Sequence, residues 1–419
     1  MKRGPNIHRH LMVLVLLSSM VWAQNSGSQA ADSQSDVKRE LPIPSGEYGV
    51  GRQALDLTEN THPDSPSSIA GGHRELMVYI WYPARQSSSK RGSDYFPFAA
   101  QIDKDPKYKE AAREIFGASW AMIVDGSIHA HAVTDARPVV GAQFPLVLFF
   151  PGYSSTTFSY TAQIENLVSY GYVVVAVEDT NGSGMVRFLD GRIGLIQSPP
   201  PSASNSTDPL QAMIASAQEG TQTSAEHARY VLDTLKRITT LSEIMNFSRI
   251  GVVGHSAGGT LAARACQIDP RIKVCISEDG EVNPVGAFFD YSDHNSMQQP
   301  FLLIQVEHDP TDEELARMHE SRTKWNEFLV HEQWQLRQCG KGSYLIRLHR
   351  PGMGHSSFSD GPLLSARDNE QAAIALENLR QTEELEKAFL DKYLKDASMP
   401  IFGQTDTTLP GISIEPIYK

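Results

Sequence analysis

The stretch Arg249-Ile-Gly-Val-Val-Gly-His-Ser-Ala-Gly-Gly259 decides the fold. A run rich in β-branched residues leads directly into Gly254-x-Ser256-x-Gly258, and good helix formers follow from Thr260 to Cys266. This order predicts a strand, a tight turn and a helix, with Ser256 at the tip of the turn. Glycines suit the flanking positions because larger side chains would clash there. We interpret the stretch as a nucleophile elbow rather than a glycine-rich turn with an incidental serine.

Short apolar segments alternate with helical stretches from about Leu41 to Lys395, which is typical of a mostly parallel sheet with helices on both faces. Most predicted strands are continuous apolar runs, as expected for strands buried on both sides. The predicted strands cover residues 75–82, 145–150, 172–178, 250–254, 273–277, 301–306 and 343–348. Together with the elbow, they predict a single α/β domain with the α/β-hydrolase fold.

Two segments interrupt the alternation. Residues 106–124 are predicted to form an amphipathic helix, and residues 198–206 form a Pro/Ser-rich loop before a helix predicted at about 210–237. We interpret both as packing elements, with a role as a cap over the site as the alternative.

The N-terminal segment, residues 1–23, has the pattern of a secretory signal peptide: basic residues, an apolar run from Leu11 to Leu17, and a small residue at Ala23. The apolar run is too short to span a membrane. We therefore expect a secreted or periplasmic protein without a stable membrane span. The expected organisation is a disordered linker at residues 24–40, a catalytic domain at 41–395 and a C-terminal tail at 396–419.

The chain is acidic, with 49 acidic against 37 basic residues and a net charge of −12. This charge argues against a nucleic-acid partner, because binding to phosphates needs clustered basic residues. The sequence implies no cofactor and no metal, and we interpret the His129 and His131 pair as ordinary surface or core residues. The sequence does not define an oligomeric state.

Three cysteines are too few for a scaffold built on disulfides. Cys275 lies inside an apolar run, which predicts a buried thiol. The other two cysteines are Cys266 and Cys339. The alternative to three unpaired cysteines is one disulfide, most simply one that involves Cys339.

A serine hydroxyl becomes nucleophilic only beside a general base that a carboxylate orients. In the predicted fold the order along the chain is serine, acid, histidine. The best base is His355, which follows the last predicted strand in a Gly/Pro-rich loop. His349 and His308 are weaker candidates.

Two aspartates are candidates for the acid. Asp279 follows the strand at 273–277, and Asp309 follows the next strand, at 301–306. Both would emerge at the carboxyl edge of the sheet, where α/β proteins bind ligands, so the sequence pattern admits either.

The oxyanion hole of such a site needs two N–H donors, one from the residue after the nucleophile and one from an early loop. Ala257 supplies the first. The second is expected from the loop Phe149-Phe-Pro-Gly-Tyr153; because Pro151 has no N–H, the donor is Tyr153 or, failing that, Gly152.

From about Pro42 to Asp360 the chain resembles the plasma-type platelet-activating factor acetylhydrolases. The matching motifs are Pro44-Ser-Gly-Glu-Tyr-Gly-Val-Gly51, Val78-Tyr-Ile-Trp-Tyr-Pro83, Gly171-Tyr-Val-Val-Val-Ala-Val-Glu178, Gly254-His-Ser-Ala-Gly258, Glu278-Asp-Gly-Glu-Val-Asn-Pro-Val-Gly286 and His355-Ser-Ser-Phe-Ser-Asp360. The resemblance implies Asp279 as the acid and His355 as the base. The Pro151-Gly-Tyr153 loop departs from the family's usual His-Gly and looks more like cutinase-like polyester hydrolases, whose acid falls at Asp309.

We therefore expect a secreted serine esterase that acts through an acyl-enzyme, with Ser256, His355 and Asp279 as the triad and with Tyr153 and Ala257 in the oxyanion hole. The resemblance implies a small ester or lipid-like substrate with a short acyl chain, and a role in lipid degradation. The alternatives are a cutinase-like polyester hydrolase or lipase, a peptidase, and a non-catalytic exported binding protein that keeps the hydrolase fold.

Overall fold

The computed structural model describes residues 37, 39–59, 74–85, 92–180, 182–196, 209–282, 297–307, 309–317, 321–403 and 409–417. The expected signal peptide, most of the expected linker and the loop at 198–206 lie outside these residues.

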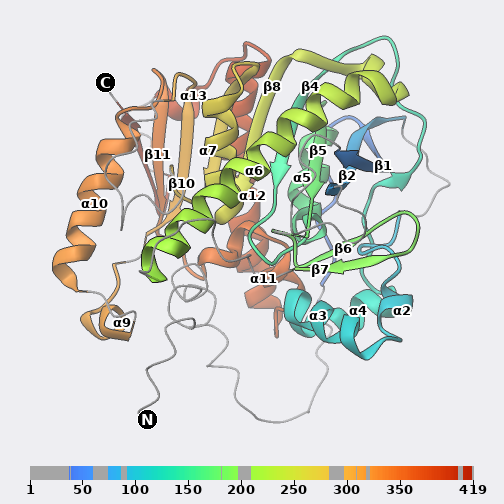
Figure 1. The fold of residues 1–419 in the computed structure, drawn as a ribbon, viewed down its shortest axis with the longest axis horizontal. Helices are drawn as coiled ribbons and strands as arrows, with labels where there is room; N and C mark the ends of the chain where they lie inside the picture. The colour runs from blue at the N-terminus through green and yellow to red at the C-terminus, as the bar shows by residue number, and fades with distance from the viewer. Residues whose placement is uncertain are drawn as a thin grey trace.

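Twelve strands and a series of helices make up the described part of the chain (Figure 1). The strands are β1 Gly49–Glu59, β2 Arg74–Ala84, β3 Val133–Thr134, β4 Phe144–Phe150, β5 Val173–Glu178, β6 Met185–Arg187, β7 Ile193–Leu195, β8 Met245–His255, β9 Ile272–Glu278, β10 Phe301–Val306, β11 Ser343–Leu348 and β12 Ile412–Ile417. The α-helices are α2 Ala99–Ile102, α3 Pro106–Phe116, α4 Trp120–Val124, α5 Thr161–Ser169, α6 Pro209–Ile238, α7 Ala257–Ile268, α9 Asp312–Arg317, α10 Arg322–Leu336, α11 Gly361–Leu364, α12 Asn369–Leu394 and α13 Pro400–Gly403. The 3₁₀ turns are η2 Gly117–Ser119, η3 Thr157–Tyr160, η4 Thr240–Ile244 and η5 His355–Phe358.

Ten of these strands form one sheet in the order β12-β11-β10-β9-β8-β4-β5-β2-β1-β3. The central pairs from β5 to β11 are parallel, whereas β2 pairs antiparallel with β5, β1 with β2, and β12 with β11. The prediction of a mostly parallel sheet is therefore confirmed. The order places β8, which leads to the elbow, in the middle of the sheet.

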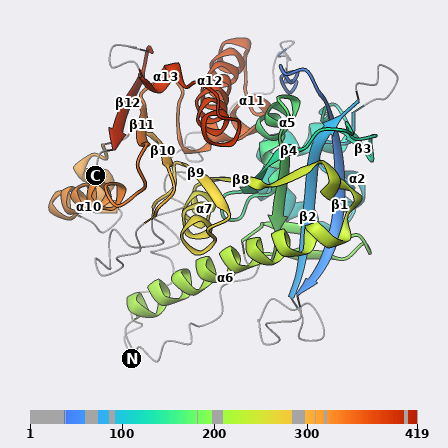
Figure 2. The same ribbon diagram turned by 90° about the horizontal axis from the view of Figure 1, so that it is seen from above.

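Helices cover both faces of the sheet, as predicted (Figure 2). On one face α5 and α12 pack against side chains such as Phe149 of β4, and Phe389 of α12 belongs to this core. On the other face α6 and α7 pack against the alternate side chains, with Leu148 of β4 and Val231 of α6 in a second core. Successive residues of a strand point to opposite faces, so apolar runs such as β4 serve both cores. No helix within the described ranges has the length and apolar composition needed to cross a membrane.

Two segments differ from the sequence-based expectations at the edges of the sheet. Strand β1 was not predicted, because polar residues such as Arg52 and Asp56 interrupt its apolar pattern. The expected domain boundary at residue 395 comes too early, because β12 pairs with β11 over residues 412–417 and thereby extends the sheet. A strand that pairs at one edge needs fewer apolar residues than a central strand.

The helix expected at residues 106–124 is broken in the structure. Helix α3 ends at Phe116, and Gly117 adopts a φ of 56°, which glycine accepts without the steric cost that other residues meet. A 3₁₀ turn and the short helix α4 follow. Phe116 and Trp120 stack across the break with ring centroids 5.8 Å apart, so both pieces pack as one unit against the core.

Candidate active site

Ser256 lies in the turn between β8 and α7, in the centre of the sheet. Its φ of 58° and ψ of −126° are rare for a residue with a side chain, and such strain is typical of functional turns. The chain must pass very close to neighbouring backbone here. A Cβ atom on Gly258 would lie 2.2 Å from the carbonyl oxygen of Phe150, so the position requires glycine. The strand, turn and helix predicted around Ser256 are all present.

His355 reaches Ser256 from the loop that follows β11, which we call the histidine loop, residues 349–358. Nε2 of His355 lies 2.9 Å from Oγ of Ser256. The two residues are 99 positions apart in the sequence, and the sheet brings them together because β8 and β11 end at the same edge. The structure thus places the predicted base within hydrogen-bond distance of the predicted nucleophile.

Asp279 lies on the other side of the His355 ring. Its Oδ2 is 2.6 Å from Nδ1 of His355, and its Oδ1 accepts a hydrogen bond from the backbone N–H of Val306 at 2.9 Å. Asp279 has a φ of 50°, and its own N–H donates to the carbonyl of Ile304 at 2.6 Å. The aspartate is therefore fixed against β10, with one oxygen directed to the imidazole.

Asp309 does not take part in this arrangement. Its side chain is 77% exposed and forms an ion pair with Arg322 of α10 at 2.5 Å. His349, one of the weaker candidates for the base, pairs instead with Glu307. His308, the other weaker candidate, lies outside the described residues. Of the two aspartates that the sequence admits, the structure brings only Asp279 to His355.

The loop after β4, residues 151–155, lies against the elbow, and we call it the oxyanion loop. A Cβ atom added to Gly152 would lie 3.5 Å from Cβ of Ser256, so the loop backbone lies close to the serine. The N–H of Gly152 donates to the hydroxyl of Tyr160 at 3.0 Å. This bond leaves Tyr153 as the better candidate donor from the loop. Ala257 is the first residue of α7, where an N–H has no acceptor within the helix.

A buried aspartate holds the histidine loop to the rest of the domain. Asp360 accepts hydrogen bonds from the Tyr95 hydroxyl at 2.9 Å and from the backbone N–H groups of Thr161 and Ala162 at 2.9 and 3.2 Å. The N–H groups belong to the first turn of α5, where a carboxylate is stabilised. Burial raises the pKa of Asp360 well above its usual range. The sequence motif His355–Asp360 includes this aspartate without showing its role. Its contacts show that it anchors the histidine loop to α5.

The β6–β7 hairpin supports the oxyanion loop from outside. The N–H of Ser154 donates to the carbonyl of Gly182, and the N–H of Gly184 donates to the carbonyl of Ser155, each at 2.8 Å. These bonds join the loop to the segment that enters the hairpin.

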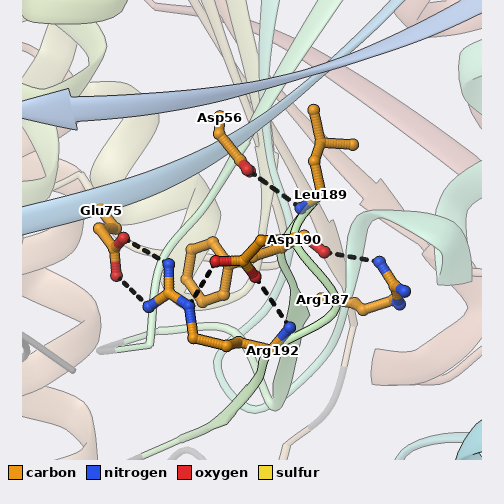
Figure 3. A network of polar contacts seen from close by, with 7 residues as sticks. Asp56, Glu75, Arg187, Leu189, Asp190 and Arg192 are labelled. Carbon is orange, nitrogen blue, oxygen red and sulfur yellow. Dashed lines mark hydrogen bonds and ion pairs between the residues drawn. The ribbon is translucent and has the colours of Figure 1, made fainter. Parts of the chain in front are cut away.

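A network of charged side chains fastens the tip of the hairpin to the sheet (Figure 3). Arg192 forms two hydrogen bonds with Glu75 of β2, at 2.6 and 2.7 Å, and a third with Asp190 at 2.6 Å. The carboxylate of Asp56 on β1 accepts from the N–H of Leu189 at 3.0 Å. The hairpin is thus bound at its tip to two strands and at its base to the oxyanion loop.

A group of buried carboxyls lies behind Asp279, on the face that α12 covers; we call Glu278, Glu383 and Glu386 the carboxyl cluster. Gln163 of α5 donates to Glu278 at 2.6 Å and to Glu386 at 2.9 Å through its one amide nitrogen. Burial raises the pKa values of Glu278 and Glu386. The neighbouring Glu386 raises that of Glu278 further, and the hydrogen bonds from Gln163 lower both in part. Burial and the neighbouring Glu386 raise the pKa of Glu383 to about 8. The cluster therefore favours protonated carboxyls.

The cysteines differ from the expectation. Cys266 of α7 and Cys275 of β9 form a disulfide, and Cys339 is a buried cysteine outside this bridge. The prediction of a buried thiol at Cys275 was wrong, as was the choice of Cys339 as the bridged residue. A short turn joins α7 to β9 and brings the Cα atoms of Cys266 and Cys275 to 6.5 Å from each other. The spacing of the cysteines in the sequence does not show this distance. Among the described residues, no three His, Cys, Asp or Glu side chains gather in a way that would hold a metal ion.

The fold and the hydrogen-bonded Ser256, His355 and Asp279 define an α/β-hydrolase. The sequence matches the family model described as "Platelet-activating factor acetylhydrolase, isoform II" over residues 33–190 and 210–374, more than half of the chain. The chain belongs to this family, and the resemblance seen in the sequence motifs is confirmed.

Individual relatives are distant. A protein of Arthroderma benhamiae described as "Probable 1-alkyl-2-acetylglycerophosphocholine esterase" is 27% identical over 255 residues, which cover 57% of this chain and 58% of the relative. The platelet-activating factor acetylhydrolase of Cavia porcellus is 23% identical over 326 residues, 72% of this chain and 68% of the relative. The matched region thus spans less than two thirds of the fungal relative's length.

Among solved structures, a ferulic acid esterase from Streptomyces cinnamoneus superimposes with a TM-score of 0.65, and the match covers 90% of this chain and 98% of the esterase. The two sequences are 24% identical. At this identity the likeness concerns the fold alone, and it agrees with the predicted α/β-hydrolase fold.

Proposed function

We propose that the protein is a serine esterase that cleaves carboxylic esters through an acyl-enzyme. The observation that carries the proposal is the continuous line of hydrogen bonds from Ser256 through His355 to Asp279, at 2.9 and 2.6 Å. This is the constellation that acyl transfer by serine requires: a nucleophile, a base, and a carboxylate that orients the base.

In the proposed mechanism Oγ of Ser256 attacks the carbonyl carbon of the ester, and its proton passes to Nε2 of His355. The Nδ1–H of His355 donates to Asp279, which keeps the imidazole in the required tautomer and stabilises its protonated form. His355 then gives the proton to the leaving alcohol, and an acyl-enzyme remains. A water molecule activated by His355 attacks the acyl-enzyme, which releases the acid and regenerates Ser256.

The negative charge that forms on the carbonyl oxygen needs donors that are already in place. We assign these to the N–H groups of Tyr153 and Ala257, since the N–H of Gly152 is bound to Tyr160. Removing one such donor typically costs about 3 kcal/mol of transition-state stabilisation.

For the substrate we propose esters with a short acyl chain, including phospholipid-like acetyl esters, with a role in lipid degradation. Support comes from the family and from the descriptions of the Arthroderma and Cavia relatives as an esterase and an acetylhydrolase. We also propose that the protein is exported, as its N-terminal sequence predicts. The Cys266–Cys275 disulfide supports export, because such bonds persist mainly in oxidising compartments.

The test is hydrolysis of p-nitrophenyl esters of increasing acyl length and of a 1-alkyl-2-acetylglycerophosphocholine, by wild type, Ser256→Ala and Ser248→Ala. Ser248 is an exposed serine at the far end of the same strand and serves as the matched control. We expect activity that falls steeply with acyl length, persists in Ser248→Ala and drops by about 10⁶-fold in Ser256→Ala. Activity that persists on long chains would favour a lipase or polyester hydrolase, and inactivity on all esters would favour a peptidase or a binding protein. Full activity of Ser256→Ala would refute the assignment of the nucleophile.

A further inference from the structure

A chain of three hydrogen bonds runs behind the candidate site, from the backbone of Gly152 to the backbone of His355. The N–H of Gly152 donates to the Tyr160 hydroxyl at 3.0 Å. That hydroxyl lies 2.8 Å from Nδ1 of His255, and Nε2 of His255 lies 2.8 Å from the carbonyl oxygen of His355. The Tyr160 and His255 side chains are both buried. The chain joins the oxyanion loop, the end of β8 and the histidine loop.

The direction of every bond in this chain is fixed. A carbonyl oxygen only accepts, so Nε2 of His255 carries a hydrogen and donates it to His355. A neutral imidazole has one N–H, so Nδ1 of His255 accepts from the Tyr160 hydroxyl. The Tyr160 oxygen in turn accepts the N–H of Gly152, which only donates. All three bonds therefore point from the oxyanion loop towards the histidine loop.

His255 stays neutral, as this pattern requires. Burial, together with the charge of the nearby His355, lowers the pKa of His255 to about 3. Burial also raises the pKa of Tyr160, so its hydroxyl keeps the hydrogen that it donates. The pattern is thus the same at every pH at which an esterase of this kind would work.

Aromatic packing holds the His255 ring in place. The ring stacks on Phe358 of the histidine loop, with centroids 5.4 Å apart and an interplanar angle of 28°. The His355 ring lies 4.7 Å away on the same loop. Tyr160 packs against Phe149 of β4 at 5.1 Å. Both rings of the chain are therefore fixed by contacts that do not depend on their hydrogen bonds.

We propose that Tyr160 and His255 are positioning residues, which hold the oxyanion loop and the histidine loop in register with Ser256 through this directed chain of hydrogen bonds. The inference rests on the proposed esterase function. Each group in this chain of hydrogen bonds lies next to a residue of the candidate site. Gly152 precedes Tyr153, His255 precedes Ser256, and the last bond is to His355 itself. Loss of one bond would displace these groups relative to one another, and displacements of about 1 Å cost about 100-fold in rate.

The decisive variants are Tyr160→Phe, His255→Leu and the two combined. Tyr160→Phe removes one oxygen and keeps the ring on Phe149. Tyr172→Phe is the matched control, because it also removes the hydrogen bond of a buried tyrosine, to Asp391 at 2.7 Å, but on the side of the domain where α12 ends. His255→Gln supplies a partial rescue, since its amide can still donate to the carbonyl of His355.

Two rates are measured for each variant: ester turnover, as kcat and KM separately, and the rate at which a fluorophosphonate labels Ser256 with loss of fluoride. We expect Tyr160→Phe and His255→Leu each to lower kcat and the labelling rate by about 10- to 100-fold, with KM changed less than about threefold. The double variant should be no slower than the slower single variant, because the effects of two substitutions that break the same chain of hydrogen bonds do not add. His255→Gln should recover part of the His255→Leu loss. Tyr172→Phe should lose comparable thermal stability and keep its kcat.

Three results would overturn the inference: a labelling rate within about twofold of wild type in Tyr160→Phe, losses that multiply in the double variant, or a loss that appears in KM alone. The rate of Ser256 labelling also tests this inference independently of which ester is the substrate. A wild type that is labelled but hydrolyses no ester refutes the esterase proposal and leaves the labelling rates of the variants to decide the inference. A wild type that is not labelled at all refutes both.

Discussion

Asp279 and His355 are joined by a hydrogen bond of 2.6 Å between Oδ2 and Nδ1, and the second oxygen of Asp279 is bound to the backbone of Val306. The carboxylate is therefore fixed from two directions. Such an aspartate determines which nitrogen of the imidazole carries the proton, so it acts on catalysis without touching the substrate.

Asp279→Asn is expected to keep the fold and to lower kcat by about 10⁴-fold, because the amide favours the wrong tautomer of His355. Asp309→Asn is the matched variant: its side chain is exposed and pairs with Arg322, so we expect kcat within about twofold of wild type. Ester turnover of both variants, with circular dichroism to verify folding, decides between them. A larger loss in Asp309→Asn would assign the acid to the position that cutinase-like enzymes use.

Gly152→Ala is expected to lower kcat by about tenfold or more. Its Cβ would lie 3.1 Å from the Tyr160 hydroxyl and 3.2 Å from Nδ1 of His255, so the oxyanion loop must move away from the elbow. Gly220→Ala on α6 is the control, because a Cβ there meets no atom within 4 Å and alanine favours a helix. Equal turnover in both variants would show that the loop tolerates displacement.

The disulfide predicts the chemistry of the three cysteines. When the purified protein is unfolded without reductant and alkylated, only Cys339 should react, and Cys266 and Cys275 should react after reduction. Reduction should also lower the free energy of unfolding by about 2 to 3 kcal/mol, the value that chain entropy gives for a loop of this size. Peptide mass mapping and denaturant titration measure the two effects. Alkylation of all three cysteines in the unreduced sample would contradict the pairing.

The carboxyl cluster predicts that stability falls as the pH rises. Glu383 has a pKa of about 8 in the folded chain, against about 4.3 when unfolded. Its contribution to the free energy of unfolding is therefore fully present below pH 4 and is lost as the pH rises through 8. Glu278 and Glu386 shift in the same direction. Glu386→Gln should therefore raise Tm at pH 8 by about 2 °C or more and change it little at pH 5.

Glu377→Gln, an exposed change on the same helix, is the control for this pH series and should leave the slope of Tm against pH unaltered. Thermal unfolding at four or five pH values is sufficient. A wild-type Tm that rises between pH 5 and pH 8 would show that the cluster is ionised in the folded protein.

The sequence predicted the central part of the fold well and its edges poorly. Continuous apolar runs such as Phe144–Phe150 identify strands buried on both faces, and the elbow identifies the strand on which the site is built. Strands β1 and β12 carry polar residues, so only their pairing with neighbours reveals them. Strand pairing is a contact between residues that lie far apart in the sequence, so the local pattern of apolar residues does not reveal it.

The candidate site shows the same division. Ser256 and His355 lie in loops with a distinctive local sequence, and the structure brings the two side chains together. Asp279 and Asp309 each follow a strand and cannot be separated by local pattern; their difference arises from Val306 and Arg322, which are 27 and 13 positions away. Tyr160 and His255 had no signal of their own in the sequence, since their role depends on a partner 95 positions away.

The oxyanion loop has two supports that differ in their chemistry. On one side, the hairpin tip is held by Arg192, whose side chain is 40% exposed and whose partners are carboxylates. On the other side, Tyr160 and His255 hold the loop with neutral groups away from water. Dissolved ions at about 1 M reduce the reach of exposed charges to about 3 Å but act little on buried dipoles. High ionic strength therefore weakens the outer support more than the inner one, and the inner one is the support that adjoins Ser256 and His355.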